Sequence, residues 1–218
     1  MERMSTKPAP INEWANAEHA LAYLSRADRV PHRTEGEATL LELVPRSARR
    51  ILDLGTGDGR LLALLKIDRP HAEAVALDFS PAMLQAARER FAGDPLVTII
   101  EHNMDHPLPE LGQFDAIVSS FAIHHCTDDR KRGIYAEAFA RLVPGGAFCN
   151  LEHVDSPTPE VHAQFLAALG ITPETEDQSN KLLDMATQLG WLREIGFAHA
   201  DCYWKWRELA LLAGFKPA

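Results

Sequence analysis

The feature that most constrains the fold is a short apolar run that passes through three alternating glycines into a leucine-rich stretch. The run is Ile51-Leu-Asp-Leu-Gly-Thr-Gly-Asp-Gly59, and Arg60-Leu-Leu-Ala-Leu-Leu65 follows it. A strand, a tight turn and a helix in this order open a nucleotide-binding α/β unit. The glycines let the backbone turn sharply and approach a ligand closely, because no Cβ blocks positive φ.

The spacing of these glycines argues against two common phosphate sites. A dinucleotide-binding loop has the pattern G-x-G-x-x-G, but the third glycine of that pattern falls on Arg60. No Gly-Lys-Ser/Thr follows, which excludes the phosphate loop of nucleoside triphosphatases. Asp53 stands at the end of the apolar run, where a carboxylate repels a pyrophosphate and favours a ligand that carries an ammonium group.

Further motifs follow the glycine loop in a fixed order. They are Asp53-Leu-Gly-Thr-Gly-Asp-Gly59, Val75-Ala-Leu-Asp-Phe-Ser-Pro-Ala-Met83, Phe114-Asp-Ala-Ile-Val-Ser-Ser120 and Leu142-Val-Pro-Gly-Gly146. As a set, this part of the chain (roughly residues 45–155) resembles the class I S-adenosylmethionine-dependent methyltransferases. The resemblance implies S-adenosylmethionine as cofactor and S-adenosylhomocysteine as product.

Strands and helices alternate through this region, which predicts a doubly wound, mostly parallel sheet. After the fifth strand, Ser156–Asn180 is rich in proline and acidic residues around one short helix, an insertion typical of a lid or substrate wall. A helix at Lys181–Ile195 and a final strand pair with one antiparallel member follow. The resemblance implies that this pair completes a seven-stranded Rossmann-like sheet. The five earlier strands are expected at Arg50–Leu54, Glu73–Asp78, Val97–Glu101, Phe114–Ser119 and Ala147–Glu152, and the final two at Ala198–Trp204 and Leu209–Phe215.

The length of 218 residues suits one domain with appendages. We expect an N-terminal tail and helical lid (1–44), a cofactor-binding core (45–155), a lid or substrate insertion (156–196) and a C-terminal strand pair (197–218).

Two N-terminal helices precede the core. Apolar residues recur at helical spacing from Ile11 to about Ser25, and Thr34-Glu-Gly-Glu37 is a capping-box pattern that predicts a helix over Glu35–Val44. In the resembling family such helices close over the methionine end of the cofactor, which makes Tyr23 and Arg33 candidates for touching it. A helix anchor at Tyr23 and a solvated Arg33 are the alternatives.

Ligands of open α/β sheets lie outside the carboxyl ends of the strands. This rule selects Asp78, about twenty residues beyond the glycine loop, whose carboxylate can accept hydrogen bonds from both ribose hydroxyls. Phe79 follows it and is expected against the adenine. Met83 lies one helical turn further and either packs on the same ring or belongs to the core.

The resemblance adds cofactor contacts on the neighbouring strands. Asn103 and Met104 stand where the family reads the adenine amino group, with Asp105 as a competing assignment. Ser119 stands where a backbone carbonyl meets the methionine ammonium, which Asp53 would also hold. Gly55, Thr56 and Gly57 form the loop around the cofactor.

His124 and His125 come soon after the fourth strand, beside the expected position of the transferable methyl group. Histidine has a pKa suited to removing a proton from a hydroxyl or amine acceptor. We favour His124 as this base, because His125 adjoins a helix entry and can be occupied there. A packing or capping role for both histidines is the alternative. No metal site is expected.

Charge and cysteine content indicate which binding partners and which cellular compartment suit the chain. The net charge of −9 repels polyanions, so binding of nucleic acid is not expected without a local basic patch. Three widely spaced cysteines without a C-x-x-C pattern fit a reducing cytoplasm, and no signal peptide or membrane-spanning run is present.

The prediction is a cytoplasmic enzyme that methylates an O, N or C nucleophile of a small molecule. Ser119-Ser-Phe-Ala stands where an Asn/Asp-Pro-Pro-Tyr motif would indicate methylation of a nucleobase or of a glutamine amide. A tRNA-modifying enzyme of the same fold and a non-catalytic cofactor-binding regulator stay open as alternatives, and so does a homodimer.

Overall fold

The computed structural model describes residues 30–218, so Tyr23 and the helix expected at residues 11–25 lie outside the described residues. The described chain forms a seven-stranded sheet in the order β3-β2-β1-β4-β5-β7-β6, with β7 antiparallel to both neighbours. The predicted Rossmann-like fold is therefore confirmed. Its strands are β1 (Arg50–Leu54), β2 (Glu73–Asp78), β3 (Val97–Glu101), β4 (Phe114–Ser120), β5 (Leu142–His153), β6 (Ala198–Trp206) and β7 (Leu209–Phe215).

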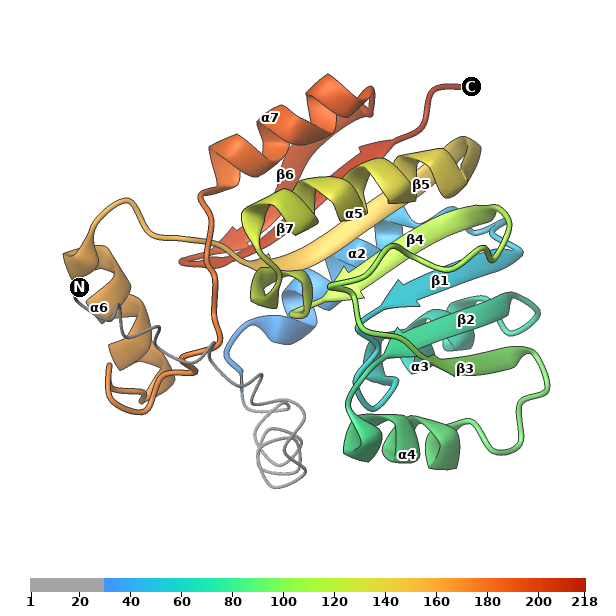
Figure 1. Ribbon diagram of the computed structural model, residues 1–218, viewed down its shortest axis with the longest axis horizontal. Coiled ribbons are helices and arrows are strands. Elements are labelled where there is room, and N and C mark those ends of the chain that lie inside the picture. The colour runs from blue at the N-terminus through green and yellow to red at the C-terminus, as the bar shows by residue number, and fades with distance from the viewer. Residues whose placement is uncertain (1–29) are drawn as a thin grey trace, which may run out of the picture.

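Helices cover both faces of this sheet, as Figure 1 shows. On one face α5 and α7 contribute to an apolar cluster that contains Leu52, Leu54 and Leu77, and on the other α2 and α3 contribute to one that contains Ile51 and Ala76. Neighbouring strand residues point to opposite faces, so a strand covered on both sides must be apolar throughout. The helices of the described chain are α2 (Arg33–Leu43), α3 (Arg60–Asp68), α4 (Pro81–Arg90), α5 (Asp128–Arg141), α6 (Pro159–Leu169) and α7 (Met185–Ile195), with a short 3₁₀ turn η2 (Ile123–His125).

The carboxyl ends of the parallel strands meet at one edge of the sheet. Leu54 of β1 pairs with Leu77 of β2 on one side and with Ser119 of β4 on the other. The chain order reverses between β1 and β4, which is where open α/β sheets form their ligand crevice. The fold thus brings the glycine loop and the ends of β2, β3 and β4 together.

Two predicted helix starts are wrong. Helix α2 begins at Arg33 rather than Glu35, and its N-cap is His32 in the left-handed conformation with φ of 61°. The capping box does not form, because the Glu37 carboxylate instead accepts hydrogen bonds from Arg33 (2.8 Å) and Arg60 (2.9 Å). Helix α7 begins at Met185 rather than Lys181. Its N-cap is Asp184, whose side chain accepts a hydrogen bond from the Thr187 N–H at 2.8 Å.

The fifth strand is longer than expected. It begins at Leu142 rather than Ala147, because Leu142 already pairs with Phe114 before a register shift between Phe114 and Ala116. The Pro-Gly-Gly segment that signals a turn in the sequence thus lies inside an irregular strand.

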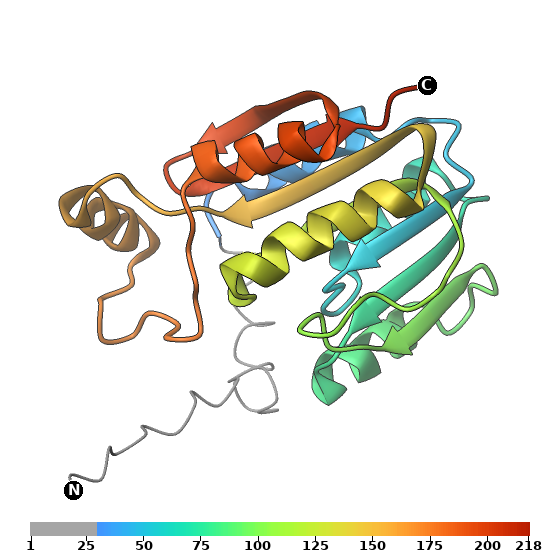
Figure 2. The same cartoon turned by 45° about the horizontal axis from the view of Figure 1, so that its top comes forward.

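The insertion after β5 lies at one end of the molecule (Figure 2). Phe165 and Leu166 of α6 pack with Leu209 in a small separate apolar cluster. The following loop then returns to η2, where the Lys181 N–H donates to the His124 carbonyl at 3.0 Å. In residues 30–218, none of the helices has the length and apolar character needed to cross a membrane.

Candidate active site

A pocket lies at the carboxyl edge of the sheet, where the glycine loop faces the ends of β2, β3 and β4. Its walls come from α2, from all four of these chain segments, and from the turn that contains η2. The lining residues include Arg33, Asp53, Gly55, Thr56, Gly57, Asp78, Phe79, Met83, Asn103, Met104, Asp105, Ser120, Phe121, Ala122, His125 and Cys126.

Asp53 is a buried carboxylate with one unpartnered oxygen. The residue is 1% exposed, and its Oδ2 accepts a hydrogen bond from the Thr56 hydroxyl at 2.6 Å. Its Oδ1 has no hydrogen-bond partner among the described residues. Burial raises the pKa of Asp53 to about 7, partly opposed by the bond from Thr56 and reinforced by Asp78 and Asp58. A cationic group beside Oδ1 would relieve this cost.

The glycine loop brings backbone close to the turn after β4. Gly55 has a φ of 68°, and a Cβ at this position would overlap the Cβ of Ala122. The Thr56 N–H donates to the Leu77 carbonyl at 2.8 Å, which ties the loop to the end of β2. Gly57 also has positive φ, at 57°, and its N–H donates to Oδ2 of Asp78 at 2.8 Å.

Asp78 is held in place through its own carboxylate. Oδ2 accepts the Gly57 N–H and Oδ1 accepts the Ser80 N–H, both at 2.8 Å. Burial raises the pKa of Asp78, and the backbone hydrogen bonds oppose that rise. Because a carboxylate offers about four acceptor positions, two lone pairs remain for ligand hydroxyls. Phe79 is half-buried in the pocket wall, and Met83 is buried beside it.

The loop after β3 forms the third wall. The Asn103 side-chain oxygen accepts the Asp105 N–H at 2.9 Å, so it shapes the loop and keeps one further lone pair. Met104 is buried, whereas Asp105 is exposed. All three residues line the pocket, so the structure does not separate the two assignments.

Ser119 is fully buried, and its hydroxyl donates to the Leu54 carbonyl at 2.8 Å. Its side chain thus joins β4 to β1, and Ser120 is the serine that lines the pocket. Arg33 also lines the pocket, so the alternative of a solvated Arg33 does not match the structure. It is buried and ion-paired with Glu37 at 2.8 Å, and its guanidinium lies 5.3 Å from the centre of the Phe121 ring.

Comparison with known proteins assigns this chain to a family. A family model described as a methyltransferase domain matches residues 51–146. A demethylmenaquinone methyltransferase of Clavibacter sepedonicus is 32% identical over an alignment 202 residues long, which covers 83% of this chain and 79% of that protein. This chain belongs to the class I S-adenosylmethionine-dependent methyltransferases. Other curated relatives match this methyltransferase over about half of their own length.

Solved structures agree on the fold. An O-methyltransferase family protein from Burkholderia thailandensis superposes with a TM-score of 0.75 at 21% identity, covering 99% of this methyltransferase and 66% of that chain. Human N-acetylserotonin methyltransferase in complex with S-adenosylmethionine has a TM-score of 0.67 at 17% identity, covering 94% and 58%. At these identities the likeness shows the fold alone.

The residues of the pocket fit the cofactor of this methyltransferase family. The unpartnered Asp53 oxygen suits the ammonium of its methionine part, and the remaining lone pairs of Asp78 suit its ribose hydroxyls. Beside Asp78, only the Met83 sulfur lies within 4 Å of the position that a Cβ on Gly57 would take, so the loop leaves room for a ligand there.

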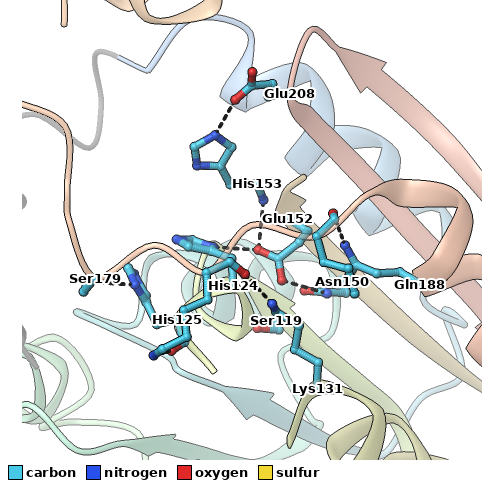
Figure 3. A network of polar contacts seen from close by, with 12 residues as sticks. Ser119, His124, His125, Lys131, Asn150, Glu152, His153, Ser179, Gln188 and Glu208 are labelled. Carbon is cyan, nitrogen blue, oxygen red and sulfur yellow. Dashed lines mark hydrogen bonds and ion pairs between the residues drawn. The ribbon is translucent and has the colours of Figure 1, made fainter. Parts of the chain in front are cut away.

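His124 and His125 of the methyltransferase have different surroundings, as Figure 3 shows. His125 lines the pocket, and its Nδ1 lies 3.0 Å from the Ser179 hydroxyl. His124 is only 6% exposed, is absent from the pocket lining, and places Nδ1 2.6 Å from Oε1 of Glu152. The expectation that His124 is the one beside the pocket therefore does not match the structure. The backbone of η2 turns its ring toward the end of β5.

A polar network behind His124 had no signal in the sequence. The fully buried Glu152 accepts hydrogen bonds from the His153 N–H (2.9 Å) and the Asn150 side-chain amide (3.1 Å) as well as contacting His124. The Tyr135 hydroxyl, which Asn150 also contacts, donates to Gln188 at 2.6 Å. Burial raises the pKa of Glu152 and lowers that of His124 far below its usual value, so the imidazole is neutral at pH 7.

Proposed function

We propose that this methyltransferase acts on a small molecule, at an oxygen, nitrogen or carbon nucleophile that enters the pocket beside His125. The observation that carries the proposal is the continuity of the lining. One pocket contains Asp53 and Asp78, which suit the cofactor, and also His125 with Phe121, Ala122 and Cys126. A small, largely apolar acceptor suits this second group, because few polar atoms there need a partner.

The cofactor supplies a sulfonium methyl group that is already activated for in-line displacement. The chain's own task is to align the two reactants and exclude water, since correct placement alone supplies much of the rate enhancement. The pocket wall formed by the buried Met104 and the half-buried Phe121 and Ala122 supports the exclusion of water.

His125 supports the removal of the acceptor's proton. Burial, followed by repulsion from His124, lowers the pKa of His125 to about 3, so the ring is neutral at pH 7 and keeps a nitrogen lone pair. Such a weak base takes a proton efficiently only as that proton becomes acidic. A hydroxyl reaches this condition as its oxygen forms the new bond to carbon.

The names of the relatives support an aromatic or quinone-related acceptor without fixing it, since one acts on demethylmenaquinone and another on N-acetylserotonin. Cys126, Cys149 and Cys202 are all free, which supports a reducing, cytoplasmic location. A homodimer stays a prediction.

The test is methyl transfer from isotopically labelled S-adenosylmethionine to a panel of quinols, phenols and amines, read by mass spectrometry. We expect a methylated product from at least one aromatic acceptor. His125→Ala should lower kcat by about 10²-fold, at the low end of general-base effects, with the affinity for S-adenosylhomocysteine unchanged.

The matched control is His106→Ala, because His106 is exposed and outside the pocket lining. This variant should retain wild-type turnover. Equal turnover in His125→Ala, or a loss confined to a stably folded His124→Ala, would reject His125 as the residue that serves the acceptor.

A further inference from the structure

The loop that follows α6 is hydrogen-bonded to the η2 turn through Lys181. The Lys181 N–H donates to the His124 carbonyl at 3.0 Å, and the Lys181 ammonium donates to the His125 carbonyl. The buried ammonium of Lys131 on α5 in turn donates to the Lys181 carbonyl. The position of His125 is therefore set by a segment about fifty residues further along the chain.

The same loop also determines which nitrogen of His125 carries the proton. Asp177 Oδ1 accepts both the Ser179 N–H (2.8 Å) and the Ser179 hydroxyl proton (2.7 Å). A carboxylate only accepts, and a serine hydroxyl has one proton to donate. Because that proton is directed to Asp177, the 3.0 Å contact between Ser179 Oγ and His125 Nδ1 requires Nδ1 to be the donor.

We infer that Asp177 and Ser179 are positioning residues that hold His125 as the Nδ1–H tautomer, with its lone pair on Nε2. The chain Asp177–Ser179–His125 orients the imidazole much as a carboxylate orients a catalytic histidine, but through a hydroxyl and from the insertion. Its consequence for turnover rests on the proposed function, because only a histidine that serves the acceptor needs a defined tautomer.

This arrangement also gives the insertion a role beyond covering the pocket. Ser179 is partly buried and Asp177 belongs to the loop that lines a second, polar cleft with His162 and Glu176. Asp177 and the Ser179 N–H close a local turn in this loop, and the Ser179 hydroxyl extends the contact to the His125 ring.

The test is the tautomer of His125, read from long-range ¹H–¹⁵N correlations of the histidine rings in the full chain without ligand at pH 7. His125→Asn identifies its signals by their loss. We expect a protonated Nδ1 and an unprotonated Nε2 in the wild type. Ser179→Ala should move the ring to the Nε2–H form or to a mixture, and Ser179→Thr, which keeps the hydroxyl, should restore the wild-type form. Thr175→Ala is the control, because its hydroxyl contacts only Thr172 within the same loop.

Kinetics give the second readout. Ser179→Ala should lower kcat about ten- to a hundredfold with little change in KM, and Ser179→Thr should recover most of the loss. A wild-type His125 in the Nε2–H form, or a tautomer unchanged by Ser179→Ala, would overturn the inference. The wild-type spectrum decides even if Ser179→Ala does not fold. The expected tautomer in a chain that transfers no methyl group would instead reject the proposed function and leave this assignment standing.

Discussion

Asp53 should make the ligand-free protein less stable than it would be without that charge. Burial raises its pKa from 3.8 to about 7, so the folded state binds a proton that the unfolded state has lost. The difference of about three pKa units corresponds to about 4 kcal/mol, since each unit is worth about 1.4 kcal/mol. Because the folded-state pKa is raised, the contribution of Asp53 to stability is greatest below pH 4 and is lost as the pH rises through about 7.

Asp53→Asn removes the charge and keeps the shape of the side chain. The amide oxygen can still accept the hydrogen bond from Thr56, but its NH₂ takes the place of the unpartnered Oδ1. A buried unpaired donor costs about 1–3 kcal/mol, which leaves a net gain of about 1–3 kcal/mol at pH 8. For a chain of this length the gain corresponds to roughly 2–12 °C in Tm.

The assay is thermal unfolding of both chains without cofactor from pH 4 to pH 8.5. The advantage of Asp53→Asn should grow between pH 4 and pH 7 and then level off. Asp105→Asn is the control, because it removes an exposed carboxylate from the same pocket and should leave Tm unchanged. An Asp53→Asn chain that is less stable than wild type at pH 8, or a difference independent of pH, would refute the reasoning.

Two further predictions concern the loop and the insertion. Gly55→Ala should destabilise the protein by more than about 3 kcal/mol in chemical unfolding, since the new Cβ would overlap Ala122 at a positive φ, while Gly93→Ala, with open space around it, should be neutral. Burial lowers the pKa of His162, but its hydrogen bonds to Glu208 and Glu176 outweigh burial and raise it above 6.5. The stability from these ion pairs is therefore complete below pH 6.5 and lost as the pH rises through the folded-state pKa. Amides of α6 should exchange more slowly in wild type than in His162→Asn at pH 6, and at equal rates at pH 9.

Much of the sheet follows from local sequence. The bounds expected for β1, β2 and β3 agree with the structure, because short apolar or β-branched runs between glycine, proline and acidic breakers define those strands. Pro81 stands at the first position of α4, where its fixed φ and missing N–H suit the start of a helix. The carboxyl ends of these strands then indicate a ligand edge without further information.

Tertiary contacts explain the elements that sequence patterns missed. Glu37 has the spacing of a capping box, but two arginines from α2 and α3 hold its carboxylate. The sequence pattern predicts a helix from Lys181 onward. The ammonium and the N–H of Lys181 are instead bonded to the η2 turn, so α7 starts later. The partner of His124, Glu152, stands 28 residues away, and no local pattern records that distance.

Which of the two histidines faces the pocket also depends on tertiary contacts. Sequence reasoning placed His124 beside the acceptor from its position after β4 and from the helix entry next to His125. The direction of each ring depends on η2, on the end of β5 and on Ser179, which come together only in the folded chain.

A pocket around Asp78 that holds S-adenosylmethionine also binds S-adenosylhomocysteine, and titration calorimetry measures that binding. We predict saturable one-to-one binding to the wild-type chain and about ten- to a hundredfold weaker binding to Asp78→Ala, because charge-assisted hydrogen bonds to hydroxyls are worth roughly 1.5–3 kcal/mol. Asp129→Asn, which removes an exposed carboxylate outside the pocket lining, should bind as the wild type does. No binding to the wild type, tight binding of NAD instead, or an affinity unchanged in Asp78→Ala would contradict this account.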